Sequence, residues 1–272
     1  MFTDAHCHPF DLSGLYTDCE KERRRLGVLA AASACDMTEF THNTELAFKA
    51  GVDKTVAVLP CFGIHPQLPA FKKARNEIYC DTEINENLET LHNLARAGKI
   101  TAVGECGFDL YNAVFRETEA LQDRLFAAQI DTALNFELPV VIHLRRAMRK
   151  VFAAVKTLAK CKAVVFHSWA GSFNEGEALL KRGVNAFFSF GNPIRLNHKE
   201  VMRCCSIFPA GRLLSETDAP FQPPRGQNYS QWSDLPLIIE TSAALRREAG
   251  SSHQTTPELE ARIEANFKSV FF

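Results

Sequence analysis

The segment that decides the fold is FTDAHCHPFD, at residues 2–11. Its first half is short and apolar enough to predict a buried strand over Phe2–His6. In a dinucleotide-binding sheet, the first strand is usually followed by a glycine-rich fingerprint. This strand runs instead into two histidines and Pro9. The segment therefore favours a closed (β/α)8 barrel over an open doubly wound sheet.

The same unit, a short apolar run followed by a longer amphipathic stretch, recurs along the chain. The apolar runs are rich in Val, Ile, Phe and Ala, which predicts strands buried on both faces. They are Phe2–His6, Val28–Ala34, Thr55–Cys61, Ile100–Glu105, Val140–His143, Ala163–His167, Asn185–Phe190 and Leu213–Glu216. The clearest helices are expected at Thr38–Ala50, Ile84–Ala97, Glu117–Glu137, Arg146–Lys160, Glu175–Arg182, Leu235–Glu248 and Pro257–Phe271. This repetition in 272 residues predicts an α/β fold, a single-domain TIM barrel over residues 1–272.

The composition is that of an ordinary globular protein. The chain has 46% hydrophobic and 23% charged residues, which excludes a disordered chain and a coiled coil. Its 31 Lys and Arg residues nearly balance 32 Asp and Glu residues, so the formal net charge is -1. Such neutrality argues against a protein that coats nucleic acid by bulk attraction, but it leaves room for a local positive patch.

The nine cysteines form no CxxC pair, and several lie inside apolar runs. Free cysteine behaves as a small buried hydrophobe, whereas disulfide frameworks are typical of small secreted chains. The N-terminal segment has no basic n-region and no apolar h-region, and the apolar stretches are shorter than a membrane span. We therefore expect a cytoplasmic protein with reduced thiols and no membrane partner.

Residue types that bind metals gather at the ends of the predicted strands. In a barrel the carboxyl ends of all strands share one rim, and active sites are built there. The residues expected at this rim are His6, His8, His65, Glu105, His143, His167 and Asp218. The remaining histidines are expected on the surface, and they are His42, His92, His198 and His253.

Each motif also has a purely structural interpretation. His6 and His8 can clasp one ion because residues i and i+2 of a strand share a face, yet two neighbouring histidines also arise by chance. Asp4 is placed either to orient one of these imidazoles or to cap a turn. Glu105 ends an apolar strand that has no Lys or Arg. It therefore either pairs with a distant cation or bridges two divalent ions.

His143 and His167 close two successive strands, and two equivalent histidines favour ligation over isolated core positions. Asp218 alone is a common turn residue, but strand eight neighbours strand one in a closed barrel. Four imidazoles and two carboxylates suit zinc, manganese or similar divalent ions. Strand alternation points Cys7 and Cys106 away from this set, so neither is assigned as a ligand.

An ordered set of motifs covers essentially the whole chain. These are FTDAHCHPFD, GIHP at Gly63–Pro66, VGECGFD at Val103–Asp109, LPVVIHLRRA at Leu138–Ala147, VFHSWAGS at Val165–Ser172, FFSFG at Phe187–Gly191, LLSETDAP at Leu213–Pro220, Arg225–Gly226 and Asn266–Phe267. In this order they resemble the TatD-related metal-dependent hydrolases of the amidohydrolase superfamily. Relatives commonly have HCFSG where this chain has HSWAG, and RG-x-RN-x-P where it lacks the second arginine.

The resemblance implies a TIM barrel that holds two divalent ions per subunit, as zinc, manganese or magnesium. The implied metal ligands are His6, His8 and Asp218 for one ion, His143 and His167 for the other, and Glu105 as the bridge. The implied substrate-binding residues are His65, Arg145 and Arg225. Asp218 and Glu105 are the expected catalytic residues, with Asp218 accepting the proton of the attacking water.

The activity implied by the resemblance is deoxyribonuclease action of the 3′–5′ exonuclease type, on DNA ends or single-stranded DNA. Trp169 and Phe221 either stack a base or pack in the core. One alternative is a hydrolase of small esters, lactones, amides or phosphoesters with the same metals, because barrel loops change substrate readily. Another is a barrel that has lost catalysis and serves as a scaffold. The sequence leaves the native metal and the oligomeric state open.

Overall fold

The computed structural model describes residues 1–75, 77, 79–253 and 255–272. One eight-stranded sheet runs in the order β1 to β8, and each strand pairs in parallel with the next. The strands are β1 Thr3–Cys7, β2 Leu29–Ala32, β3 Val58–Phe62, β4 Ala102–Asp109, β5 Val140–Arg145, β6 Val164–Phe166, β7 Ala186–Phe190 and β8 Leu213–Ser215. This sheet with helices around it confirms the predicted (β/α)8 barrel.

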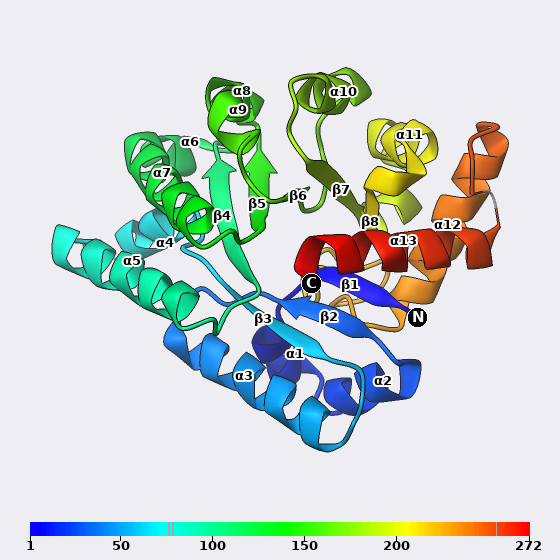
Figure 1. Ribbon diagram of the computed structural model, residues 1–272, viewed down its shortest axis with the longest axis horizontal. Coiled ribbons are helices and arrows are strands. Elements are labelled where there is room, and N and C mark those ends of the chain that lie inside the picture. The colour runs from blue at the N-terminus through cyan, green and yellow to red at the C-terminus, as the bar shows by residue number, and fades with distance from the viewer. Residues whose placement is uncertain (76, 78, 254) are drawn as a thin grey trace.

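The helices lie outside the sheet, as Figure 1 shows. Their bounds are α1 Pro9–Leu15, α2 Cys19–Leu26, α3 Met37–Val52, α4 Leu68–Ala74, α5 Asp81–Arg96, α6 Ala113–Arg116, α7 Glu119–Asn135, α8 Met148–Ala153, α9 Val155–Leu158, α10 Phe173–Lys181, α11 Lys199–Ile207, α12 Asp234–Glu248 and α13 Thr256–Phe271. Two 3-10 helices, η1 Asn192–Arg195 and η2 Ala210–Arg212, flank α11. Within the described residues, none of these helices is long and apolar enough to cross a membrane.

The seam between β8 and β1 is held by side chains and by backbone hydrogen bonds, such as that from the Asp218 amide to the His6 carbonyl at 3.0 Å. The Ser215 hydroxyl donates to the Thr3 carbonyl at 2.7 Å. The carboxylate of Asp4 accepts hydrogen bonds from the Thr217 amide at 2.9 Å and the Thr217 hydroxyl at 2.6 Å. Of the two roles expected for Asp4, this geometry supports closing a turn, since its carboxylate binds the loop after β8 and not an imidazole ring.

The amino-terminal end of the barrel is closed by α13. Phe267 and Phe271 pack against an interior layer of small and branched apolar residues from the strands. The Asn266 amide group of the same helix donates to the carbonyls of Ala210 and Leu213, at the start of β8. This plug leaves the carboxyl ends of the strands as the open mouth of the barrel.

All nine cysteines are free thiols, as the sequence predicts. Seven of them are buried, while Cys35 is partly exposed and Cys80 is exposed. Burial raises the pKa of the Cys61 thiol to about 12, so this thiol stays protonated. The thiol of Cys7 faces the carbonyl of Ala31, away from the mouth, as expected from strand alternation.

Strand β4 is longer than the sequence predicts. The apolar run ends at Glu105, but pairing with β5 continues through Asp109, opposite Arg145. Residues 106–108 extend the ladder because they pair with residues 142–144 of β5. Glu105 therefore lies inside a strand, and the expectation that it ends one is wrong.

Candidate metal centre

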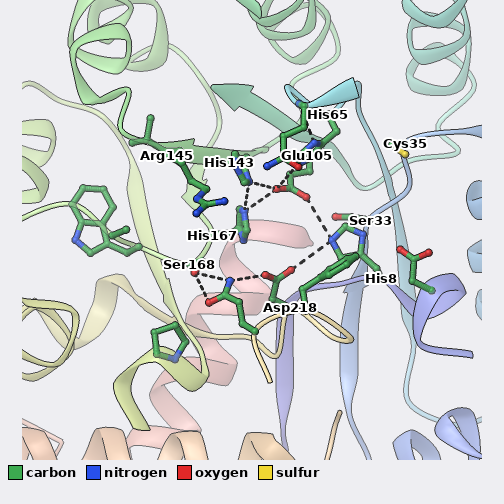
Figure 2. Close-up of a pocket in the computed structure, with 18 of the residues that line it drawn as sticks. His8, Ser33, Cys35, His65, Glu105, His143, Arg145, His167, Ser168 and Asp218 are labelled. Atoms are coloured by element: carbon green, nitrogen blue, oxygen red, sulfur yellow. Dashed lines mark hydrogen bonds and ion pairs between the residues drawn. The ribbon is translucent and has the colours of Figure 1, made fainter. Parts of the chain in front are cut away.

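The six predicted metal ligands converge at the carboxyl end of the barrel, and Figure 2 labels all of them except His6. They come from β1, β4 and β5, from the residues directly after β1 and β6, and from the loop that follows β8. All are at least half-buried, and they line or underlie a cavity of about 620 Å³. This volume lies within the range of about 300–1,000 Å³ that is typical of ligand sites.

Glu105 lies at the centre of the cluster, and its two oxygens face different histidines. Oε2 lies 3.1 Å from His6 Nε2 and 3.5 Å from His8 Nε2. Oε1 lies 2.7 Å from His143 Nδ1 and 2.8 Å from His167 Nε2. A carboxylate divided in this way between two donor sets has the arrangement that a bridging ligand needs.

Two glycines allow β4 to present Glu105 so close to β5. A Cβ on Gly107 would overlap the carbonyl oxygen of His143, and a Cβ on Gly104 would lie 2.6 Å from that of Val141. Both glycines also adopt positive φ values, of 132° and 152°, which L side chains rarely adopt. Only glycine fits these positions, and the close approach places Glu105 beside His143.

His6, His8 and Asp218 form the first donor group. The Nε2 atoms of the two histidines lie 3.1 Å apart, and Asp218 Oδ1 lies 3.5 and 3.6 Å from them. The other ring nitrogen of His6 contacts the Ser33 hydroxyl at 3.1 Å. The Gln222 amide donates to Asp218 Oδ2 at 2.6 Å. Ser33 and Gln222 hold the ligands in place, and sequence reasoning missed both because their types occur in any loop.

His143 and His167 form the second group, with 3.2 Å between Nδ1 of the first and Nε2 of the second. The other nitrogen of His143 lies 3.1 Å from Asp109 Oδ2. The free nitrogen of His167 faces Glu216, 3.7 Å away. Carboxylates behind ligating histidines fix ring orientation and raise basicity. The sequence signal for Asp109 was its position four residues beyond Glu105, which the shorter predicted strand hid.

The charges of the cluster are strongly coupled. Burial raises the pKa of Glu105, but the surrounding imidazoles, His65 and His167 foremost, hold it well below its usual value. Burial lowers the pKa of His8, but the carboxylates of Asp218 and Glu105 outweigh it and raise this pKa to about 10. The buried carboxylates therefore demand positive charge close by, which a proton or a metal ion can supply.

The donor set fits divalent ions. The facing nitrogens of His6 and His8 cannot both donate, so the space between them suits a proton or a cation. Imidazole nitrogens and carboxylate oxygens are ligands that zinc, manganese and similar ions accept. Three-residue groups with mutually close ligand atoms include His6, His8 and Asp218, and also His65, Glu105 and His143. The residues present thus meet the chemical requirement of a metal centre.

The predicted substrate-binding residues differ in position. His65 Nε2 lies 3.2 Å from Glu105 Oε1, so this ring is as close to the centre as the predicted ligands. Arg145, at the end of β5, lines the cavity and is 45% exposed. Arg225 is exposed in the loop after β8 and, among the described residues, does not belong to the cavity lining. Its role in substrate binding stays a prediction.

The two aromatic residues expected to stack or pack take different roles. Trp169 is 2% exposed and packs against Phe166 and Phe188, so it belongs mainly to the core. Phe221 is 48% exposed, lines the cavity and contacts the His8 ring edge to face at 5.2 Å. His198, expected simply on the surface, is exposed but also lines the cavity.

A (β/α)8 barrel with a histidine and carboxylate cluster at its mouth defines the class of metal-dependent hydrolases. The sequence model of the TatD related DNase family matches residues 3–272, and the chain belongs to this family. This membership confirms the expected hydrolase that acts on phosphodiester bonds.

Individual relatives agree with this assignment. The 3′-5′ ssDNA/RNA exonuclease TatD of Pantoea sp. (strain At-9b) is 31% identical over 193 residues, which are 68% of this chain and 71% of the relative. The crystal structure of YJJV, a TatD homologue from Escherichia coli K12, is similar with a TM-score of 0.80 and 25% identity, covering 99% of this chain and 97% of YJJV. An uncharacterized amidohydrolase from Saccharomyces cerevisiae, at 16% identity and a TM-score of 0.78, shares the fold.

Proposed function

We propose that this chain is a two-metal exonuclease that removes nucleotides from the 3′ ends of single-stranded DNA. The observation that carries the proposal is Glu105, whose two oxygens face two separate histidine pairs. The name of the Pantoea relative, a 3′-5′ ssDNA/RNA exonuclease, supports the substrate class and polarity. The cytoplasmic location and the single-domain boundaries expected from the sequence stay predictions.

In this proposal His6, His8 and Asp218 would hold one divalent ion. His143 and His167 would hold the other, and Glu105 would be shared between the two. Two bound ions of this kind lower the pKa of a water molecule and neutralise charge on phosphoryl oxygens. The buried imidazoles and carboxylates already lie within about hydrogen-bond distance of each other. They therefore need little rearrangement to bind the metal ions.

Asp218 is the proposed proton acceptor. Burial raises its pKa, but His8, His167 and His6 outweigh that effect and hold the pKa below its ordinary value. The carboxylate is therefore ionised at neutral pH and able to take the proton of the attacking water. Its Oδ2 is oriented by Gln222, and it lines the cavity where the substrate enters. Asp218 would then pass the proton to the leaving oxygen.

His65 and Arg145 are the proposed contacts to the scissile phosphate. Both line the cavity, and a guanidinium is suited to bind two phosphate oxygens at once. Phe221, exposed beside His8, offers a ring on which the terminal base stacks. Arg225 lies outside the cavity lining, so it would contact the part of the nucleic acid strand that lies outside the mouth of the barrel.

The test compares Glu105→Ala and His143→Ala with Glu117→Gln, a control in an exposed ion pair with Lys73. Single-stranded DNA, RNA and a generic small phosphodiester are assayed with Mg²⁺, Mn²⁺ and Zn²⁺, and bound metal is measured by elemental analysis. We expect both site variants to stay folded by circular dichroism, to lose metal and to lose cleavage. Full activity in both would sink the proposal. Hydrolysis of small esters alone by the unmodified chain would favour the small-molecule alternative.

A further inference from the structure

The rim of the cavity has two sides of opposite charge. On one side, Arg145 is the last residue of β5 and Arg146 follows it, and both residues are exposed. On the other side, Asp11 and Glu39 line the cavity beside Cys35. Figure 2 shows Arg145 and Cys35 on opposite sides of the cavity. A polyanionic strand that leaves the mouth is therefore attracted to the β5 side and repelled by the other.

The two arginines converge on one aromatic ring. The guanidinium carbon of Arg145 lies 4.3 Å from the centroid of the Tyr111 ring, and that of Arg146 lies 4.6 Å from it. Consecutive side chains of a continued strand would point to opposite faces. Arg146 instead adopts a φ of 51°, which ends the strand, and cation–π attraction then offsets the repulsion between the two cations.

These guanidiniums keep hydrogen-bond donors available for a ligand. Among the described residues, Arg146 has no carboxylate within ion-pair distance. The nearest carboxylate to Arg145 is Asp109, at 3.7 Å, and its oxygens already bind other groups. Arg149, one turn further on, is different, because it is paired with Glu119 at 2.6 Å. Within the described part of the chain, Arg146 is thus the arginine of this pair whose charge no carboxylate matches, while Arg145 has only the distant contact with Asp109.

The backbone that carries the Tyr111 ring is held in place relative to the metal centre. Asp109 Oδ1 accepts a hydrogen bond from the Tyr111 amide at 2.9 Å, while Oδ2 lies 3.1 Å from His143. The Leu110 amide donates to the Arg145 carbonyl at 2.9 Å, which joins the loop after β4 to the end of β5. An anchored platform loses little conformational freedom when an anion binds.

We propose that Tyr111 and Arg146 form a phosphate-binding platform just outside the cavity, beside Arg145, which lines it. It holds a phosphate of the strand next to the scissile phosphodiester, so the enzyme selects polynucleotides over isolated nucleotide esters. Arg146 makes the phosphate contact, and Tyr111 is a positioning residue that holds the guanidinium in place. The inference rests on the proposed exonuclease function.

The test uses a short oligothymidylate and thymidine 5′-p-nitrophenyl phosphate, which has a single phosphodiester. We expect Arg146→Ala and Tyr111→Ala to lower the ratio of kcat/KM for the oligonucleotide to that for the ester by about 5–10-fold, mainly through KM. The salt dependence of oligonucleotide binding in Arg146→Ala should become less steep by about 0.7 in a log–log plot, as for one lost phosphate contact. Tyr111→Phe keeps the ring and should restore the ratio.

Arg149→Ala is the matched control, because it removes a neighbouring arginine that is already neutralised. An unchanged ratio and salt slope in Arg146→Ala would overturn the platform while leaving the exonuclease assignment intact. Equal losses in Tyr111→Phe and Tyr111→Ala, or in Arg149→Ala and Arg146→Ala, would also overturn it. Failure of the unmodified chain to cleave any oligonucleotide would instead overturn the proposed function itself.

Discussion

The two ends of the barrel are built from opposite kinds of residues. At the amino-terminal end, Phe267 and Phe271 pack on buried Ala, Leu, Val and Cys side chains. At the mouth, His6, Glu105 and His167 are each at most 5% exposed. Burial of apolar surface stabilises the first end, whereas burial of charge at the second costs free energy unless the charges are paired. The difference teaches that stability and chemistry are located in separate layers of the same strands.

The largest effect should come from the mouth. Glu105→Gln keeps the shape of the side chain but removes the charge that faces five histidines, so we expect a loss of activity of about 10³-fold or more. Chelation should lower the melting temperature of the unmodified chain by about 5 °C, because ions bind only the folded state. The melting temperature of the Glu105→Gln variant should change little when chelator is added. A variant that keeps the fall in melting temperature in calorimetry would contradict the bridging role.

The next largest effect is expected at the amino-terminal end of the barrel. Phe267→Ala removes a buried ring from the plug formed by α13 and should lower the free energy of unfolding by about 3–5 kcal/mol. Denaturant titration measures this loss. Activity per folded molecule should stay at the original level, because the ring lies at the end of the barrel opposite to the metal ligands. Loss of activity in the fully folded variant would break the separation of the two ends.

A smaller effect is expected at Asp109, which lies behind the predicted metal ligand His143. Asp109→Asn removes the charge that faces His143 Nε2 and should weaken metal binding by about 10–100-fold. Titration of the metal-free protein measures the affinity, and added metal should restore much of the activity. Asp123→Asn, in a partly buried ion pair with Lys150 away from the metal ligands, is the matched control. Equal affinities in the two variants would show that Asp109 is only a structural residue.

The smallest effect is expected at the seam between β8 and β1. Ser215→Ala removes one hydrogen bond to the Thr3 carbonyl and should cost about 1 kcal/mol of unfolding free energy. Metal affinity should not change, because the hydrogen bonds between Asp4 and Thr217 remain. A large fall in metal affinity would mean that the seam, and not local packing, sets the distance between Asp218 and the histidines of β1.

Much of the site was predictable because the type of a residue indicates whether its side chain can bind a metal ion. The two histidines of FTDAHCHPFD, the strand-terminal His143 and His167, and the LLSETDAP turn all led to residues that lie in one cluster. The full length of β4 was not predictable, because the apolar run ends at Glu105 while the ladder continues to Asp109. Hydrogen bonding to a neighbouring strand, which no local pattern records, decides where such a strand ends.

The sequence by itself determined the barrel, the ligand types and the free thiols, because repeated apolar runs and residue chemistry are local properties. Only the tertiary structure decided which oxygen of Glu105 faces which histidine, and that Ser33, Asp109 and Gln222 support the ligands. It also decided that Tyr111 gathers two arginines at the rim. These contacts join residues from different strands, and their distances depend on how closely the strands approach one another.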